Sequence, residues 1–168
     1  MKVSQICNFI VLLLIAPFAE SMSLTITGNT SICADTALIQ QGVLDYYSGD
    51  GEFQSPYYWW EGGLAFGLMI ENAFLCQNTT FNSLLQNALM QQSGDNWDFM
   101  PESQTMVEGN DDQGVWGLTL MTAAERNFSR AANGTASRKD IPEWVTMAQA
   151  IYNTMYARWD SSTCGGGL

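Results

Sequence analysis

The chain has 168 residues, contains no histidine and carries a formal net charge of −11. The negative charge disfavours nucleic acid and anionic membrane surfaces as partners, because both are polyanions. Hydrophobic residues make up 46% of the chain and charged residues only 14%, so a core can be buried and general disorder is disfavoured.

The first 21 residues have the pattern of a secretory signal peptide. Lys2 gives a positive start, residues 9–15 form an apolar run, and residues 19–21 form an Ala-Glu-Ser cleavage motif. The run is well short of the roughly 20 apolar residues that a membrane span needs. We therefore expect residues 22–168 to be secreted, and to meet a membrane only through an anchor, for which the sequence shows no C-terminal signal. Four sequons, expected to carry surface glycans, begin at Asn29, Asn78, Asn127 and Asn133.

Helical signals then follow one another along the chain, and no stretch alternates long enough to predict a strand. Ser31 is placed to cap the first helix, Pro56 to open the second, and residues 140–143 form a capping box for the fifth. Gly63 and Gly67 lie one turn apart in the second helix and allow another helix to approach closely. The predicted helices span residues 31–47, 57–76, 79–92, 111–128 and 140–159.

Three cysteines remain after the signal peptide, and an odd number leaves one thiol without a partner in an oxidising compartment. Cys33 lies near the start of the first predicted helix and Cys76 at the end of the second. Neighbouring antiparallel helices bring those two ends together. We therefore predict a disulfide between Cys33 and Cys76, with Cys164 left unpaired.

Two adjacent carboxylates, Asp111 and Asp112, stand where a long connection from Ser93 to Asn110 meets the fourth predicted helix. Loops of that length in a compact domain are usually functional. Glycoside hydrolysis needs one carboxylic acid to protonate the leaving oxygen and a second carboxylate as nucleophile or base. A helix start favours one ionised carboxylate, and mutual repulsion favours a proton on the other, so the pair suits this chemistry. The alternative, which spacing alone favours, is that the pair only caps the helix.

Aromatic and polar side chains near the pair are candidates for sugar contacts, because aromatic rings stack on the apolar faces of sugars. Glu61 either binds sugar hydroxyls or accepts N–H groups of its own helix, and we slightly favour the second interpretation. Residues 57–60, Tyr-Tyr-Trp-Trp, form a cluster of a kind that is more often core than binding surface. No phosphate loop, calcium loop or histidine site is recognisable, so we expect no metal and no cofactor. The candidate sugar-binding residues are Trp59, Trp60, Glu61, Trp97, Asn110, Gln113 and Trp116.

Three stretches, in this order, resemble the fungal members of glycoside hydrolase family 76, the endo-1,6-alpha-mannosidase-like proteins of the cell wall. They are PYYWWEGGLAFGLMIE at 56–71, EGNDDQGVWGLTLMTAAERNF at 108–128 and WDSSTCGGGL at 159–168. The resemblance implies that residues 22–168 are the N-terminal part of an (α/α)6 catalytic domain. The expected fold class is therefore all-α, a partial (α/α)6 toroid of helical hairpins. The resemblance also implies a retaining enzyme, with Asp111 as nucleophile and Asp112 as acid/base.

The same resemblance implies a substrate and a place of action. The substrate would be α-1,6-linked mannan, or the glycan of glycosylphosphatidylinositol-linked mannoproteins, cleaved or transferred at the cell wall or the outer face of the plasma membrane. Family members are longer, and five helices cannot close the whole toroid, so we expect this chain to be a fragment. The alternative is a non-catalytic protein that binds mannan or supports the wall, as a truncated and inactive copy.

Overall fold

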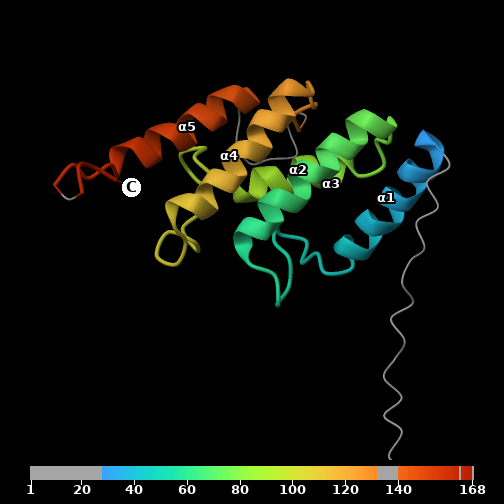
Figure 1. Ribbon diagram of the computed structural model, residues 1–168, viewed down its shortest axis with the longest axis horizontal. Coiled ribbons are helices and arrows are strands. Elements are labelled where there is room, and N and C mark those ends of the chain that lie inside the picture. Colours follow the sequence, from blue (N-terminus) through green and yellow to red (C-terminus); the bar gives the residue numbers. More distant parts are fainter. Residues whose placement is uncertain (1–27, 132–139, 163, 168) are drawn as a thin grey trace, which may run out of the picture.

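The computed structural model describes residues 28–131, 140–162 and 164–167, and its regular structure is helical (Figure 1). Within these residues, extended pairing is limited to isolated bridges between Tyr47 and Phe53 and between Asp160 and Gly167. None of the helices in this part of the chain has the length and apolar character needed to cross a membrane. The helices are α1 (Asn29–Leu44), α2 (Trp59–Cys76), α3 (Asn82–Gln92), α4 (Asn110–Glu125) and α5 (Trp144–Ala157).

The five predicted helices are all present, so the all-α prediction is confirmed, but several predicted helix starts are wrong. The first helix begins two residues before Ser31, with Gly28 at the cap position. Gly28 has a φ of 142°, a conformation that favours glycine, and it lets the helix begin at Asn29. The Ser31 hydroxyl instead donates to the carbonyl of Gly28 at 2.8 Å from within the first turn.

The predicted starts of the second and fifth helices are also wrong. Pro56 lies in a turn after a cis peptide bond, and α2 begins only at Trp59. The capping box predicted for residues 140–143 does not form, because Asp140 has a left-handed φ of 63° and Glu143, which the box would place in the first turn, is extended with a ψ of 151°. The backbone therefore becomes helical only at Trp144, and Glu143 at the cap position makes no side-chain capping bond.

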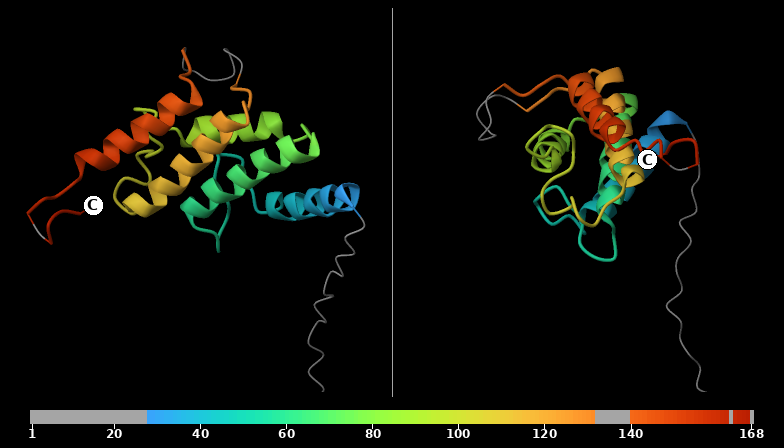
Figure 2. Two further views of the ribbon diagram at one scale, coloured as in Figure 1. Left: turned by 45° about the horizontal axis from the view of Figure 1, so that its top comes forward. Right: turned by 90° about the vertical axis from the view of Figure 1, so that its left-hand side faces the viewer.

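The α2–α4 interface forms the centre of the fold. Gly63 of α2 lies against Trp116 of α4, and Gly67, one turn later in α2, lies against Thr119, which also comes later in α4. The two helices therefore run side by side in the same direction (Figures 1 and 2). The predicted close approach at the glycines is confirmed. A Cβ at Gly63 would stand 3.0 Å from the ring of Trp116, and a Cβ at Gly67 would stand 2.7 Å from the hydroxyl oxygen of Thr119. That hydroxyl donates to the carbonyl of Gly63 at 2.6 Å and joins the two helices by a buried hydrogen bond.

The α1–α2 edge is built differently. The predicted disulfide between Cys33 and Cys76 is present, with Cα atoms 5.6 Å apart, and Cys164 is exposed and free. Along the rest of this edge lies an apolar groove of about 510 Å3, whose lining includes Ile39, Leu64, Leu68 and Leu75. All four of these side chains are exposed. The disulfide therefore fixes an edge that side-chain packing covers only in part.

Candidate active site at the start of α4

Asp111 and Asp112 both lie in the first turn of α4. One carboxylate oxygen of Asp112 accepts the backbone N–H of Gly109 at 2.7 Å, so Asp112 caps its own helix. A Cβ at position 109 would stand 2.5 Å from an oxygen of Asp111 and 3.3 Å from an oxygen of Asp112. Glycine is therefore the residue that lets both carboxylates turn back over the helix start. Asp112 thus makes the predicted capping bond, whereas capping does not account for the exposed Asp111.

A third carboxyl group, Glu108, completes the acidic cluster and was not among the residues predicted from the sequence. Burial raises the pKa of Glu108, and so do the negative charge of Asp112 and a hydrogen bond between these two side chains. Asp111 and Glu52 add smaller repulsive contributions to the raised pKa. Glu52 is itself held by the side-chain amide of Gln104 at 3.1 Å. Glu108 thus retains a proton to higher pH than an ordinary glutamate, directly beside the Asp pair.

A buried polar network holds the first turn of α4 in place. The Gln113 side chain is fully buried, donates to the carbonyl of Asp98 at 2.6 Å, and accepts from the guanidinium of Arg158 at 2.8 Å. Arg158 also donates to the side-chain oxygen of Asn110. The carboxylate of Asp98 accepts the hydroxyl of Thr154 at 2.9 Å. Asn110 and Gln113, predicted to bind sugar, therefore join α4 to the preceding loop and to α5.

Two of the predicted tryptophans lie in the core beneath this turn. Trp116 is fully buried, and its ring centre is 5.3 Å from that of Trp59 and 5.6 Å from that of Phe99. Trp59 is also buried, and its indole N–H donates to the side chain of Gln92 at 2.8 Å. These rings support the first turn of α4 from below and present no open face to a sugar.

The other predicted sugar-binding residues lie closer to the surface. Trp60 and Trp97 are half-buried, and Trp97 packs against the core with a left-handed φ of 61°. The Glu61 carboxylate accepts the backbone N–H of Tyr58 at 2.7 Å, which confirms the interpretation of Glu61 as a first-turn helix residue. Trp60 and Trp97 are thus the predicted tryptophans that keep exposed surface.

The structure therefore gathers Asn110, Asp111, Asp112 and Gln113 in one turn, and adds two residues that sequence reasoning missed. Glu108 stands four positions before Asp112, a spacing that could have drawn attention to it within the loop. Arg158 comes from the end of a distant helix, and no local pattern predicts its contacts. No group of three or more carboxylate and cysteine side chains in the described ranges is arranged to hold a metal ion.

Comparison with known proteins gives one family. The family model of glycosyl hydrolase family 76 matches residues 31–168. Among curated relatives, mannan endo-1,6-alpha-mannosidase DFG5 of Saccharomyces cerevisiae is 56% identical over 155 residues, which cover 89% of this chain and 32% of the relative. Mannan endo-1,6-alpha-mannosidase DCW1 of Candida albicans is 42% identical over 166 residues, covering 95% of this chain and 35% of the relative.

A solved structure agrees with the sequence matches. The crystal structure of Dfg5 from Chaetomium thermophilum in complex with glucosamine aligns with a TM-score of 0.76 and 30% identity, over 87% of this chain and 38% of that one. The fold and the comparisons together define the class of protein. The chain is an all-α member of the glycoside hydrolase families, and its helical hairpins form part of a toroid. Within that class, the chain belongs to glycosyl hydrolase family 76. It spans about a third of the length of the curated relatives that it matches.

Proposed function

We propose that this chain supplies the carboxylate pair of a family 76 catalytic domain that hydrolyses or transfers α-1,6-linked mannan. The names of the relatives support the substrate, since these proteins are called mannan endo-1,6-alpha-mannosidases. One structural observation carries the proposal for the chemistry. Two adjacent carboxylates share the first turn of α4, with Glu108, whose pKa is raised by burial and by its acidic neighbours, beside them.

In the proposed mechanism, Asp111 is the nucleophile. It is exposed, and it lies at a helix N-terminus, where the backbone favours a negative charge. Its carboxylate attacks the anomeric carbon and forms a glycosyl ester, while the leaving sugar oxygen takes a proton from the second carboxyl group. Water, or a hydroxyl of an acceptor glycan, then attacks the ester with base assistance, so the anomeric configuration is retained.

Asp112 is the proposed acid/base, and Glu108 explains how it can carry a proton. One carboxylate oxygen of Asp112 accepts the N–H of Gly109, and the first step needs an acid. Burial and the acidic neighbours raise the pKa of Glu108, which lies beside Asp112 and is hydrogen-bonded to it, so Glu108 keeps a proton to higher pH than an ordinary glutamate. In the proposal, Glu108 supplies its proton through Asp112 to the leaving oxygen.

The place of action follows from the sequence and remains part of the proposal. The signal-peptide pattern of residues 1–21 leads to secretion, and the cell-wall resemblance puts the chain at the wall or the outer face of the plasma membrane. The expected partner is α-1,6-mannan or the glycan of a glycosylphosphatidylinositol-linked mannoprotein. The mechanism uses carboxyl groups alone, so it requires no metal and no cofactor.

The test uses a chimera, because the chain spans only a third of its relatives. Residues 22–168 replace the matching part of the Saccharomyces cerevisiae relative, and cleavage of α-1,6-mannan oligosaccharides is measured. Asp111→Asn and Asp112→Asn should each lower turnover by orders of magnitude, because an amide neither attacks nor donates a proton as a carboxyl group does. Asp45→Asn, at an exposed acidic residue of the α1 end, is the matched control and should leave turnover unchanged.

Two further outcomes separate the roles and the alternatives. Azide should partly rescue cleavage of an activated substrate by Asp112→Ala, since such a substrate needs no acid assistance. Full activity in both Asn variants would reduce the pair to a helix cap. A parent chimera that binds mannan oligosaccharides without cleaving them would instead support the non-catalytic, wall-binding interpretation.

A further inference from the structure

The sequons that the structure describes gather at one end of the molecule. Asn78 follows the C-terminal end of α2, and Asn127 follows the C-terminal end of α4. Since α2 and α4 run in the same direction, both asparagines lie at the end opposite Asp111 (Figure 1). Asn127 lies 16 positions after Asp111, and most of that span is α4, so at 1.5 Å per residue the two are about 24 Å apart.

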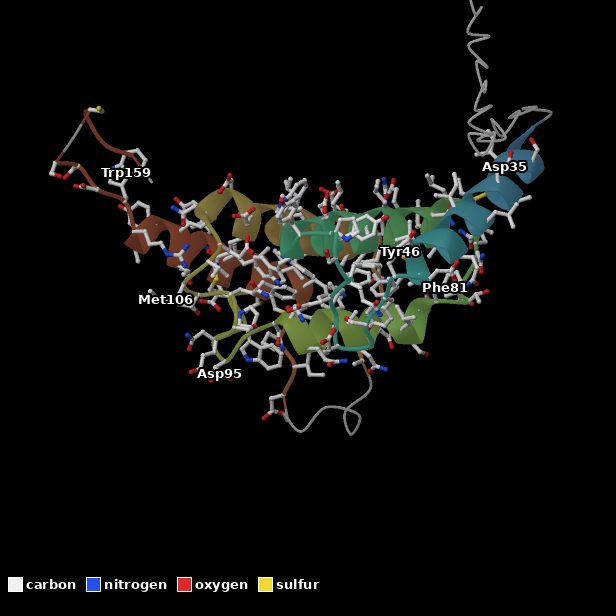
Figure 3. The ribbon with its side chains drawn as sticks, turned by 90° about the horizontal axis from the view of Figure 1, so that it is seen from below. Asp35, Tyr46, Phe81, Asp95, Met106 and Trp159 are labelled. Atoms are coloured by element: carbon white, nitrogen blue, oxygen red, sulfur yellow. A yellow bond between two sulfur atoms is a disulfide. The ribbon has the colours of Figure 1, made fainter. Side chains whose placement is uncertain are left out.

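Other landmarks agree with this division into two ends. The disulfide of Cys33 ties the start of α1, where the Asn29 sequon lies, to the C-terminal end of α2. Figure 3 shows Asp35 and Phe81 at this end of the molecule, and Asp95 and Met106, from the loop before α4, at the other. The fourth sequon, at Asn133, lies outside the described residues.

The side chain of Asn78 is already arranged as a glycan acceptor. Its oxygen Oδ1 accepts the backbone N–H of Thr80 at 3.1 Å and the hydroxyl of Thr80 at 2.6 Å. Both bonds use the oxygen, so the amide nitrogen Nδ2, the atom that receives the sugar, stays out of this turn. Thr79 and Thr80 are exposed, so an oligosaccharide has open space beside the acceptor.

The Asn127 sequon is exposed between two anchored neighbours. Asn127 itself is exposed and has a left-handed φ of 48°, which asparagine adopts readily. Phe128 is buried in the core, and Ser129 accepts two hydrogen bonds from the side-chain amide of Gln86, at 2.9 Å to the carbonyl and 2.7 Å to the hydroxyl. These contacts hold the backbone around Asn127 on the surface.

We propose that Asn78 and Asn127 carry N-linked oligosaccharides, which cover the end opposite Asp111 and Asp112 and leave the carboxylate end open to a polymeric substrate. In each case Nδ2 attacks the anomeric carbon of a lipid-linked pyrophosphate oligosaccharide, supplied by the eukaryotic secretory pathway. A carbon–nitrogen bond forms, the lipid pyrophosphate leaves, and the nitrogen gives up one proton. The statement about substrate access rests on the proposed function, whereas the modification itself does not.

The modification is tested on the 168-residue chain with its own leader, expressed in a yeast secretory host. Glycopeptide masses, with and without an amide-cleaving glycosidase, should show sugar on the peptides of Asn78 and Asn127. Thr80→Ala and Ser129→Ala should each remove sugar from their own sequon, whereas Thr80→Ser and Ser129→Thr, which keep the hydroxyl, should retain it. Unmodified Asn78 and Asn127 peptides in the parent chain would overturn the proposal.

Substrate access is tested in the chimera by moving a glycan to the other end. Ser103→Asn creates an Asn-Gln-Thr sequon in the exposed loop before α4. Once glycosylated, this variant should lose mannan cleavage, and adding Thr105→Ala, which removes the sequon, should restore it. Removal of the Asn78 and Asn127 sequons should leave cleavage intact. A glycosylated Ser103→Asn variant with full activity would overturn the statement about substrate access. An inactive parent chimera would count against the proposed function, and the glycopeptide masses would still decide whether Asn78 and Asn127 are modified.

Discussion

The α2–α4 interface and the α1–α2 edge differ in how they are held together. At the interface, two glycines admit the ring of Trp116 and the side chain of Thr119, and the contacts are buried. At the edge, an apolar groove remains open, and a disulfide joins the two helices at one end. The interface carries the start of α4 and therefore the Asp pair, whereas the edge carries none of the candidate catalytic residues.

This difference teaches which part of the chain positions the site. Trp116 lies one turn after Asp112 on α4 and stacks beside Trp59, at the first residue of α2. A tightly packed interface fixes the relative position of two helix starts, because closely packed side chains resist small shifts. The edge tolerates looser packing, because the covalent bond limits how far α1 can move. The predictions below test this division.

The largest effect is expected from removing the disulfide. Cys33 and Cys76 are 43 residues apart, and the chain-entropy relation gives about 4 kcal/mol of stability for a loop of that size. The double variant Cys33→Ser, Cys76→Ser should lose most of that amount in denaturant unfolding of the chimera. Limited proteolysis should then cut within α1 first, since the open groove covers that helix only in part. Reductant should destabilise the parent and leave the double variant unchanged; equal sensitivity of both would contradict the prediction.

The next effect compares two glycines of opposite surroundings. A Cβ at Gly63 would press on three atoms of the Trp116 ring at 3.0 to 3.2 Å, whereas a Cβ at Gly42 in α1 would meet nothing within 4 Å. Trp116 is packed between other rings and cannot retreat, so Gly63→Ala should cost about 1–2 kcal/mol net of the gain in helix propensity. Gly42→Ala should stabilise by up to about 1 kcal/mol. Two changes of the same sign in thermal unfolding would contradict the contrast.

The sequence predicted the features that depend on local pattern. The helices follow from the spacing of apolar residues, which a single element displays in full. The disulfide followed from one geometric fact, that neighbouring antiparallel helices bring the start of one beside the end of the next, and Cys33 and Cys76 occupy those ends. Gly63 and Gly67 signalled close approach because a missing Cβ has few other uses inside a helix.

The sequence failed where a residue's role depends on distant partners. Trp59 and Trp116 could have been a sugar platform or core, and the choice was made by the rings that pack on them from other elements. Gln113 looked like a sugar ligand, but its amide bonds to Asp98 and Arg158, which stand 15 positions before it and 45 after it. Backbone conformations such as the φ of Asp140 also escape capping rules, because those rules presume that the helix starts at the motif.

A smaller effect concerns Glu108, in the loop just before the start of α4. Its raised pKa comes first from burial, and then from the negative charge of Asp112 and the hydrogen bond to it. Because Glu108 keeps a proton to higher pH than an ordinary glutamate and is the proposed proton source, Glu108→Gln should move the alkaline limb of the pH profile of kcat/KM to lower pH in the chimera. A raised pKa also means that stability is lost as pH rises through it, so the same variant should be slightly more stable at neutral pH. Glu102→Gln, in the same loop and exposed, is the control and should change neither quantity.

The smallest effect is expected where the α2–α4 interface reaches its C-terminal end. There the guanidinium of Arg126 donates two hydrogen bonds to Glu71, at 2.7 and 2.6 Å, and lies 4.7 Å from the ring centre of Phe74. The bond from Arg126 holds the pKa of Glu71 below its ordinary value of 4.5. The pair therefore contributes stability above the unfolded pKa, and this contribution is lost as pH falls through the lower folded value.

Glu71→Gln should accordingly reduce the melting temperature of the chimera slightly at neutral pH, and the difference from the parent should vanish on acidification below the ordinary value. Both side chains are about one-third exposed, at 33% and 30%, so water and salt screen the pair and the loss should shrink in high salt. Arg126 keeps its contact with Phe74 in the variant, which limits the loss to the charged bond. Glu143, which forms an ion pair with Arg130, is more exposed than Glu71, so Glu143→Gln should have a still smaller effect. A difference that persists unchanged at low pH would show that the stability at this end of the interface comes from packing and not from the ion pair.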